Sequence, residues 1–307
     1  MSDNAKAMVL ASFAADALSL GVHWIYKTNV IDKKWGRVEN YFKPERPTFH
    51  PTKDLGEFTH YGDQTLVLLK SVAENSGFDP YKFTENWQQF FKSYEGYLDG
   101  ATKTTIENIE AGKVSTEAGS ESDDLAGAAR IAPLAYIYRN EPTQLFESAR
   151  TQTILTHNNQ EVIESADFFA RVVFQVLNGE KPSTAIQQTL GEHFNREPYS
   201  KWVADGIKSA DNDTRQAMLD LGQMCEIQAA FPGVIHLITK YEDNLKEGLV
   251  ENIMAGGESA ARGLIVGMVL GAHLGLDAIP SKWLSDLKAY REITDRMDQI
   301  DQKINDK

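Results

Sequence analysis

Residues 256–275, which read GGESAARGLIVGMVLGAHLG, are the stretch that decides the fold of this 307-residue chain. The stretch is strongly apolar, and a small residue recurs in it at every fourth position. These small residues are Ser259, Gly263, Gly267, Gly271 and Gly275. Each glycine inside a helix costs roughly 1 kcal/mol of helix propensity relative to alanine. The spacing is therefore expected if a second helix backbone lies against the row of small residues, which places this helix at the centre of the protein.

Helical periodicity extends outward from this stretch over almost the whole chain. Residues 162–176 repeat apolar side chains at helical spacing, and Gly179 is placed to end that helix. Asp79 before Pro80 predicts a helix start, because a carboxylate caps the first turn and proline fits the first helical position. No stretch alternates convincingly with a period of two, and no linker or repeat divides the chain. The sequence predicts an all-α helical bundle in a single domain of residues 1–307.

Composition and charge exclude several classes of protein. The chain is 42% hydrophobic and carries a net charge of -13, which argues against an extended nucleic-acid groove because that affinity depends largely on cations. Residues 263–275 are too short to span a bilayer, and the N-terminus lacks the basic region of a secretory signal. The single cysteine, Cys225, suits a reducing compartment and is predicted to be a small buried residue in an apolar helix. We expect a cytoplasmic protein with no membrane partner.

Two segments have more than one interpretation. Residues 43–61 contain three prolines and no helical periodicity, so they form either an active-site lid or a surface loop without a task. Residues 287–307 repeat apolar residues at spacings of three and four on an otherwise charged helix. This amphipathic helix either packs on its own domain, which we favour, or forms a dimer seam. The oligomeric state stays open.

Four polar residues share one stripe of the first predicted helix. Ser12, Asp16, Ser19 and His23 follow 4-3-4 spacing on a segment that is otherwise largely apolar. A carboxylate on such a helix must be paired, hydrogen-bonded or exposed to a wet cavity, because its desolvation is costly. Asp16 therefore belongs either to a satisfied internal network or to the wall of a cleft.

Acidic residues also stand where apolar helices are predicted to begin. Asp63 lies in Gly-Asp-Gln-Thr, residues 62–65, directly before four apolar residues, and capping of a helix start explains it without any site. Glu258 opens the central helix four residues before Arg262, so these two either form a surface pair or face the interior of the bundle.

A third pair of acids precedes a run of small residues. Asp123 and Asp124 come directly before residues 125–129, whose small side chains permit close approach of another backbone. Capping of the following helix would account for this pair equally well.

Taken together and in this order, these segments resemble the ADP-ribosylglycohydrolase family. Residues 15–19 (ADALS) are similar to its opening Gly-Asp-Ala-Leu-Gly motif, and residues 62–65 lie where the family has Thr-Asp-Asp-Thr. Residues 256–261 (GGESAA) fall on its Gly-Gly-Asp-Thr-Asp-Thr motif. Further similarities cover residues 127–134, 156–157 and 278–283. The resemblance spans about residues 7–287.

The resemblance implies an all-helical bundle that hydrolyses ADP-ribose linkages, usually with two Mg²⁺ or Mn²⁺ ions. The expected catalytic residues are Asp16, His23, Asp63 and Glu258. The expected substrate-binding residues are Trp24, Tyr61, Asp123, Asp124 and Arg262. The expected metal ligands are Asp63, Gln64, Thr65, Glu258 and Ser259.

Departures from the family motifs limit the metal site that this chain could form. Gln64 replaces an aspartate, Ala260 replaces another, and His23 stands where the family carries a glutamate. Two divalent ions carry about four positive charges, and each Mg²⁺ takes about six oxygen ligands. Asp63 and Glu258 supply only two negative charges between them. We therefore expect at most one Mg²⁺ or Mn²⁺ ion, and the absence of any ion stays open.

Two hypotheses of different classes follow. The first, which we favour, is a hydrolase that cleaves an N- or O-glycosidic bond of an ADP-ribose-like nucleotide. Asp16 or His23 would accept a proton, and the rings of Trp24 and Tyr61 would stack a base. The second is a catalytically impaired relative that binds a nucleotide or another small anion, because loss of carboxylates beside Arg262 favours an anion.

Overall fold

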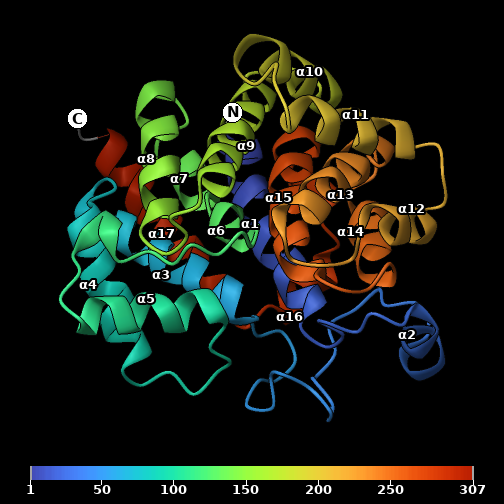
Figure 1. Ribbon diagram of the computed structural model, residues 1–307, viewed down its shortest axis with the longest axis horizontal. Helices are drawn as coiled ribbons and strands as arrows, with labels where there is room; N and C mark the ends of the chain where they lie inside the picture. Colours follow the sequence, from blue (N-terminus) through green and yellow to red (C-terminus); the bar gives the residue numbers. More distant parts are fainter. Residues whose placement is uncertain (1, 306–307) are drawn as a thin grey trace.

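The computed structural model describes residues 2–305, and every regular element in that range is a helix. At its centre α1 (Ser2–Ser19) lies beside α15 (Ser259–Leu274), as Figure 1 shows. Within the same range the only β-type pairing is two isolated bridges, Ser120 with His157 and Asp124 with Glu226. No helix in residues 2–305 is both long and apolar enough to cross a membrane. The predicted all-α fold is confirmed.

The other helices surround the central pair (Figure 1). One side carries α3 (His60–Asn75), α4 (Pro80–Phe91), α5 (Gly100–Glu110), α7 (Ala132–Ile137), α8 (Pro142–Ile154) and α17 (Tyr290–Asn305). The other side carries α10 (Pro182–His193), α11 (Tyr199–Ser209), α12 (Thr214–Leu221), α13 (Ile227–Lys240) and α14 (Leu245–Met254). Packed on α15 are α6 (Ala126–Ala129) and α9 (Gln160–Leu177), while α14 contacts α2 (Thr28–Trp35) and α1 contacts α16 (Ser281–Asp286). Two short 3-10 turns are η1 (Ser115–Glu117) and η2 (Leu276–Ala278).

The row of small residues on α15 is the surface that α1 occupies. A Cβ atom added to Gly267 would lie 2.4 Å from the carbonyl oxygen of Ala11, and one added to Gly271 would lie 2.7 Å from that of Ala7. Real Cβ atoms do not approach a backbone so closely, so the two helices can pack at this distance only because these positions are glycine. The predicted second helix backbone is therefore α1.

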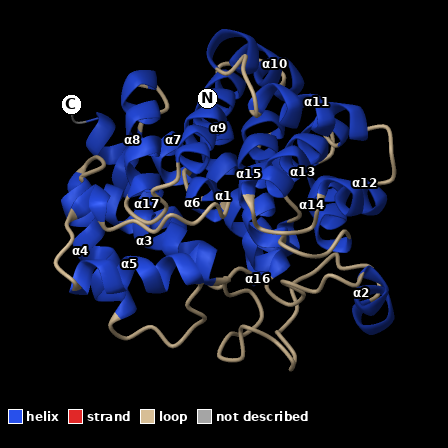
Figure 2. Cartoon of the chain, viewed as in Figure 1, coloured by secondary structure: helices blue, strands red, loops and turns tan. Residues whose placement is uncertain are grey.

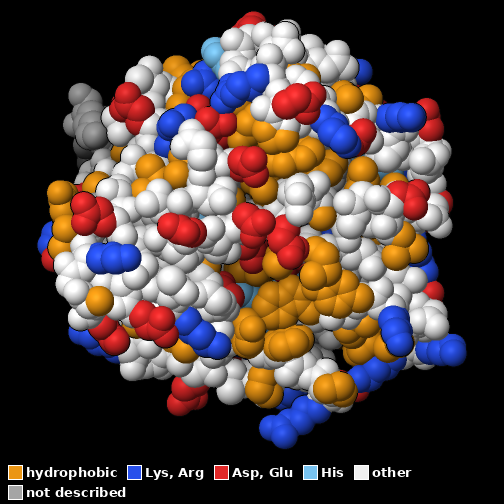
Figure 3. All heavy atoms as spheres, in the orientation of Figure 1, with side chains coloured by type: hydrophobic (Ala, Val, Ile, Leu, Met, Phe, Trp, Pro, Cys, Tyr) orange, Lys and Arg blue, Asp and Glu red, His pale blue; other side chains and the backbone are white. Residues whose placement is uncertain are grey.

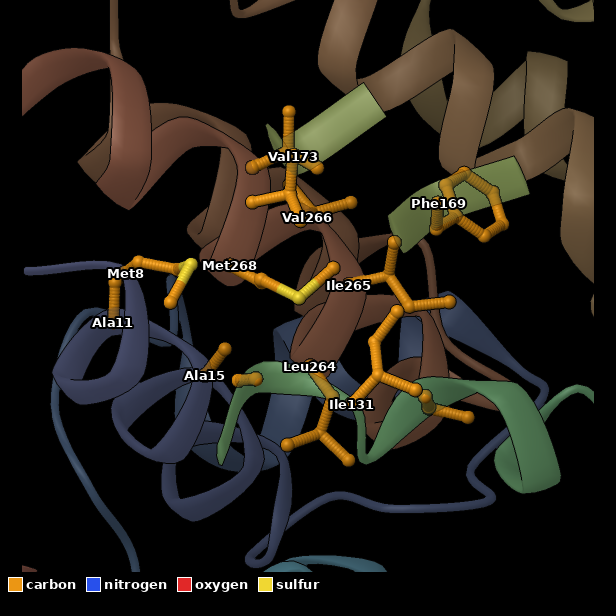
Figure 4. Close-up of a cluster of buried hydrophobic side chains, with 14 of the residues drawn as sticks. Met8, Ala11, Ala15, Ile131, Phe169, Val173, Leu264, Ile265, Val266 and Met268 are labelled. Carbon is orange, nitrogen blue, oxygen red and sulfur yellow. The ribbon is translucent and has the colours of Figure 1, made fainter. Parts of the chain in front are cut away.

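Apolar side chains close the core around this contact. Figure 4 shows side chains from α1, α9 and α15 that point toward one another, together with Ile131 between α6 and α7. Met8, Phe169 and Leu264 are all fully buried there. Burial of each such side chain stabilises the folded protein by about 1.5–3 kcal/mol.

Several helix boundaries agree with the capping residues in the sequence. Asp79 caps α4 by accepting from the backbone N–H groups of its first turn, and α9 ends before Gly179, which has a φ of 99°. The start of α3 differs, because Thr59 is its N-cap and the helix begins at His60. Asp63 is therefore not the N-cap, but it lies in the first turn of the helix, as its place at a predicted helix start indicated.

The C-terminal amphipathic helix packs on its own domain. Its apolar residues Ile293, Met297 and Ile300 are buried, and α17 contacts α1, α3 and α7. Residues 306–307 of the predicted helix lie outside the described residues. The stripe that could have formed a dimer seam is thus largely used within the chain.

Two irregular segments approach the N-terminal end of α15. Between α2 and α3 the chain forms the long loop seen along the lower edge of Figure 2, which includes the irregular residues predicted from position 43 onward and ends at Thr59. Cys225 lies in the second segment, just before α13, and is only partly buried. The prediction of a buried cysteine in a helix was wrong. The backbone carbonyl of Cys225, which lies outside any helix, accepts a hydrogen bond from the N–H of Leu125.

Candidate functional site: a buried carboxyl pair

The site centres on Glu258, the N-cap of α15. Two glycines with positive φ, Gly256 (72°) and Gly257 (69°), turn the chain just before it. A Cβ on Gly256 would lie 2.6 Å from the carbonyl oxygen of Ile25, and one on Gly257 would lie 2.3 Å from that of Gln223. Glycine is required at both positions, and the resulting turn directs the Glu258 side chain into the interior, where it is fully buried.

Glu258 is surrounded by hydrogen-bond donors. The backbone N–H groups of Ala260 and Ala261 donate to Oε1 at 3.1 and 3.0 Å. His23 Nε2 lies 3.1 Å from each carboxylate oxygen, and Trp24 Nε1 donates to Oε2 at 2.7 Å. Burial alone would raise the pKa of Glu258, but His23 and the backbone donors outweigh it and lower the pKa to about 2. The group is therefore an ionised, acceptor-only carboxylate.

A second carboxyl group meets Glu258 at the hydroxyl of Tyr61. That hydroxyl lies 3.1 Å from Asp124 Oδ2 and 3.4 Å from Glu258 Oε2. Burial, and then the negative charge of Glu258, raise the pKa of Asp124 well above its usual value. The pKa of one carboxyl group is thus lowered and that of its neighbour is raised, which is the arrangement expected of a base and an acid that share one site.

Trp24 forms the wall between this pair and the surface. Its φ is 63°, a rare value for a non-glycine residue, and its backbone N–H donates to the carbonyl of Gly257 at 3.1 Å. The indole stacks on His23 with 4.2 Å between ring centroids and contacts Phe49 and Tyr97 edge-on. Backbone strain of this kind persists where the surrounding structure holds it, often at functional sites.

An apolar hollow opens on the outer side of this wall. Its volume is about 710 Å³. Its lining includes Trp24, Tyr26, Trp35, Phe49 and two lysines, Lys27 and Lys34. Figure 3 shows an apolar patch of the surface next to a group of acidic side chains. A ligand with a planar apolar part could therefore lie against the same tryptophan that contacts Glu258.

Asp16 lies in a sealed internal network. It is fully buried, and its two oxygens accept from the backbone N–H and the hydroxyl of Thr59 at 2.8 and 2.6 Å. Burial raises the pKa of Asp16 to about 7 despite these hydrogen bonds, and the charge of Asp63 adds to the shift. Of the two sequence interpretations, the structure shows the internal network, which ties α1 to the start of α3.

Asp63 belongs to a cluster of its own. It forms an ion pair with Lys53 and accepts from the hydroxyl of Tyr94 at 2.6 Å. Burial raises the pKa of Asp63 above its usual value although Lys53 opposes the shift. No hydrogen bond or ion pair within residues 2–305 joins Asp63 to Glu258. Asp63 and Glu258 therefore have separate sets of partners.

The remaining expected metal ligands point elsewhere. Gln64 Oε1 accepts from Trp87 Nε1 at 2.8 Å and from Arg130 Nη1 at 2.6 Å. Thr65 donates to a backbone carbonyl one turn earlier in its own helix, and the Ser259 hydroxyl is buried without a partner among the described residues. Gln64 and Thr65 have different partners because successive helical residues project in different directions.

Two further expected substrate-binding residues, Arg262 and Asp123, have other contacts in the structure. Arg262 is fully buried and donates to Asn252 Oδ1 and to the carbonyl of Gly256, so it supports the glycine turn and does not form a surface pair with Glu258. Asp123 is exposed, and its backbone carbonyl accepts from Ile227. Trp24, Tyr61 and Asp124 are the members of the expected set that gather at the carboxyl pair.

Sequence reasoning missed two histidines at the site. His50 Nε2 lies 2.9 Å from His23 Nδ1, and His60 Nε2 lies 3.2 Å from Asp99 Oδ2. The three imidazoles of His23, His50 and His60 lie within 6.1 Å of one another, measured between centroids. The available signal was that two of only seven histidines fall in or beside the irregular segment from residue 43 onward.

The fold and the site together define a class: an all-α bundle whose buried carboxyl groups meet at the N-terminus of a glycine-rich central helix. The chain belongs to the ADP-ribosylglycohydrolase family, because the sequence model of that family, described as ADP-ribosylglycohydrolase, matches residues 1–307.

Known relatives are similar over most of their length. Crystallin J1A of Tripedalia cystophora is 26% identical, covering 97% of this chain and 96% of that protein. ADP-ribosyl-[dinitrogen reductase] glycohydrolase of Rhodospirillum rubrum is also 26% identical, covering 80% of this chain and 79% of that protein. A solved structure of an ADP-ribosylglycohydrolase-related protein complex shares the fold with a TM-score of 0.77 at 21% identity, covering 98% of each chain.

The donor set does not fit the divalent ions that the family resemblance implies. Both oxygens of Glu258 already receive protein donors, Asp63 is paired with Lys53, and the oxygen of Gln64 receives two donors. Within the described part of the chain no group of three or more His, Cys, Asp or Glu side chains could hold a metal ion. We therefore assign no chemical step to a metal.

Proposed function

We propose that this protein hydrolyses an N- or O-glycosidic bond of an ADP-ribose-like nucleotide with its own carboxyl pair. The observation that carries the proposal is the shared hydroxyl of Tyr61, which lies between Asp124, whose pKa is raised, and Glu258, whose pKa is lowered. Glycosidic bonds are commonly cleaved by one carboxylic acid and one carboxylate that act together. Membership of a glycohydrolase family supports the same class of reaction.

The roles follow from the protonation of the two groups. Asp124 would give its proton to the leaving group, while Glu258 would stabilise the positive charge that develops on the sugar ring. Water would then attack the anomeric carbon, and Asp124 would accept a proton from it. His23 and Trp24 would hold Glu258 in place through their hydrogen bonds. We assign no catalytic step to Asp16 or Asp63, because Asp16 is hydrogen-bonded to Thr59 and Asp63 is paired with Lys53.

The test is release of ADP-ribose from ADP-ribosylated arginine or serine peptides by the purified protein. Asp124→Asn and Glu258→Gln should each lower kcat about 100-fold or more, because each removes one half of the acid and base pair. Asp123→Asn is the matched control, since Asp123 is the adjacent but exposed acid, and it should keep at least half of the activity. Full activity of Glu258→Gln would contradict the proposal.

A second candidate is a protein that binds an ADP-ribose-like nucleotide without hydrolysis. Complete burial of Glu258 under five donors favours it, as does the similarity to a protein named crystallin. In that case ADP-ribose should raise the melting temperature in the presence of EDTA while no product forms. Turnover that requires Mg²⁺ would rule out the binder, and turnover in EDTA would favour the carboxyl-pair hydrolase.

A further inference from the structure

The ring of His50 has one polar contact, which is with His23, and His23 in turn contacts Glu258 of the carboxyl pair. The residue comes from the irregular segment between α2 and α3 and is fully buried. Its Nε2 lies 2.9 Å from His23 Nδ1, and the two rings stack with 5.2 Å between centroids. Its other nitrogen, Nδ1, has no hydrogen-bond partner among the described residues. His23 is therefore the polar partner of this ring.

The direction of each hydrogen bond follows from the acceptor at the end of the chain. Glu258 is ionised and can only accept, so His23 Nε2 carries the proton that faces it. Both rings are buried, and burial favours the neutral imidazole because a charged ring would lose its hydration. A neutral His23 with its proton on Nε2 accepts at Nδ1, so His50 must donate from Nε2.

We propose that His50 is a positioning residue that fixes His23 in the tautomer that donates to Glu258. The inference rests on the proposed function of Glu258, and it adds a residue to which the family motifs give no role. It also links the irregular segment to the chemistry, because the segment must be in place for His23 to be held in this state.

The contacts of the segment fit this role. The backbone N–H of His50 donates to Thr48 Oγ1 at 3.1 Å, and its carbonyl accepts from the N–H of Lys53 at 3.2 Å. Lys53 in turn forms the ion pair with Asp63 on α3. Thr52 donates to the carbonyl of Glu95 at 3.1 Å. Thr52 and Lys53 thus anchor the segment on the C-terminal side of His50, whose imidazole is fully buried.

The first test is the tautomer of His23, measured by ¹⁵N NMR on full-length protein labelled at histidine. Wild type should show a neutral His23 that is protonated on Nε2. His50→Leu, which keeps an apolar side chain but removes the donor, should give a mixture of tautomers. His50→Gln should restore the wild-type state, because the glutamine amide can donate to Nδ1. His236, which contacts Ser209 and Thr214 away from this site, supplies the control signal and should not change.

The second test is catalysis by the same variants. His50→Leu should lower kcat about tenfold with KM changed less than about twofold, since one hydrogen bond that orients an ionised partner is lost. His50→Gln should recover most of the rate. If no variant and no wild type hydrolyses any substrate, the proposed function fails, while the NMR result still decides the role of His50.

Three results would overturn the inference. One is a wild-type His23 protonated on Nδ1 or on both nitrogens, since His50 would then have nothing to donate to. Another is an unchanged His23 signal in folded His50→Leu protein. The third applies if the leucine variant does not fold: the glutamine variant must then keep the wild-type tautomer, and loss of that tautomer would count against the proposal.

Discussion

At the residue scale, the surroundings of each acid decide what it can do. Asp16 and Glu258 are fully buried and Asp124 is partly buried, and of the three only Glu258 has a lowered pKa, because it receives enough donors. Asp16 and Asp124 both have a raised pKa, because burial outweighs the hydrogen bonds that they receive. The pKa of a carboxyl group is therefore lowered in one place of this protein and raised in another.

The raised pKa of Asp16 predicts a specific dependence of stability on pH. The pKa rises from 3.8 to about 7 on folding, so between these values the folded state keeps a proton that the unfolded state has released. The free energy of unfolding should therefore fall as the pH rises from about 4 to about 7, by about 4 kcal/mol from this group. Urea unfolding of Asp16→Asn across this range should lack that decrease. The exposed Asp211→Asn should keep it, and an equal slope in both variants would contradict the assignment.

At the element scale, the contact between α1 and α15 depends on the absence of side chains. The row of glycines on α15 lets the α1 backbone approach, and the same approach places Glu258 close to His23, just beyond the end of α1. The sequence predicted this contact correctly, because small residues at four-residue spacing on an apolar helix are typical of a face that meets another backbone. The row of glycines on α15 thus accounts both for the packing of the two helices and for the assembly of the site.

Substitution of Gly267 by alanine should therefore lower the free energy of unfolding far more than the addition of one methyl group would indicate. The new Cβ in Gly267→Ala would meet the backbone of Ala11 at 2.4 Å, and relief of that overlap should cost about 3 kcal/mol of unfolding free energy. Gly191 in α10 is the matched control, because a Cβ there meets nothing within 4 Å. Gly191→Ala should be neutral or should stabilise the protein by up to about 1 kcal/mol. Similar losses in both variants, measured by urea unfolding, would argue against close packing at Gly267.

At the scale of the whole molecule, protein donors and an ion pair occupy the acids that the family resemblance connects with metal ions. Lys53 forms an ion pair with Asp63, and His23 contacts the carboxylate of Glu258. Both cover carboxyl groups at the starts of helices, where the backbone dipole already favours negative charge. The fold therefore satisfies these acids internally.

Thermal unfolding should accordingly respond little to divalent ions. A site filled at 100 times its Kd would add about 2.7 kcal/mol of stability and raise the melting temperature by several degrees. We expect millimolar Mg²⁺ or Mn²⁺ to shift the melting temperature of EDTA-treated protein by less than about 1 °C relative to matched ionic strength. A shift of several degrees that saturates with metal concentration would show that the donor set rearranges to bind an ion.

The sequence alone determined what depends on local spacing: an all-α fold, a central helix marked by small residues, most helix caps, and the order of the family motifs. The tertiary structure decided which acids meet. Tyr61 and Glu258 are 197 positions apart, and their contact depends on how the ends of α3 and α15 are placed, which no local period encodes. For the same reason the motif at residues 62–65 predicted the right segment but not its contacts, since Asp63 and Gln64 project toward different partners. Spacing along a helix fixes a direction, whereas a site requires several helices to converge on one point.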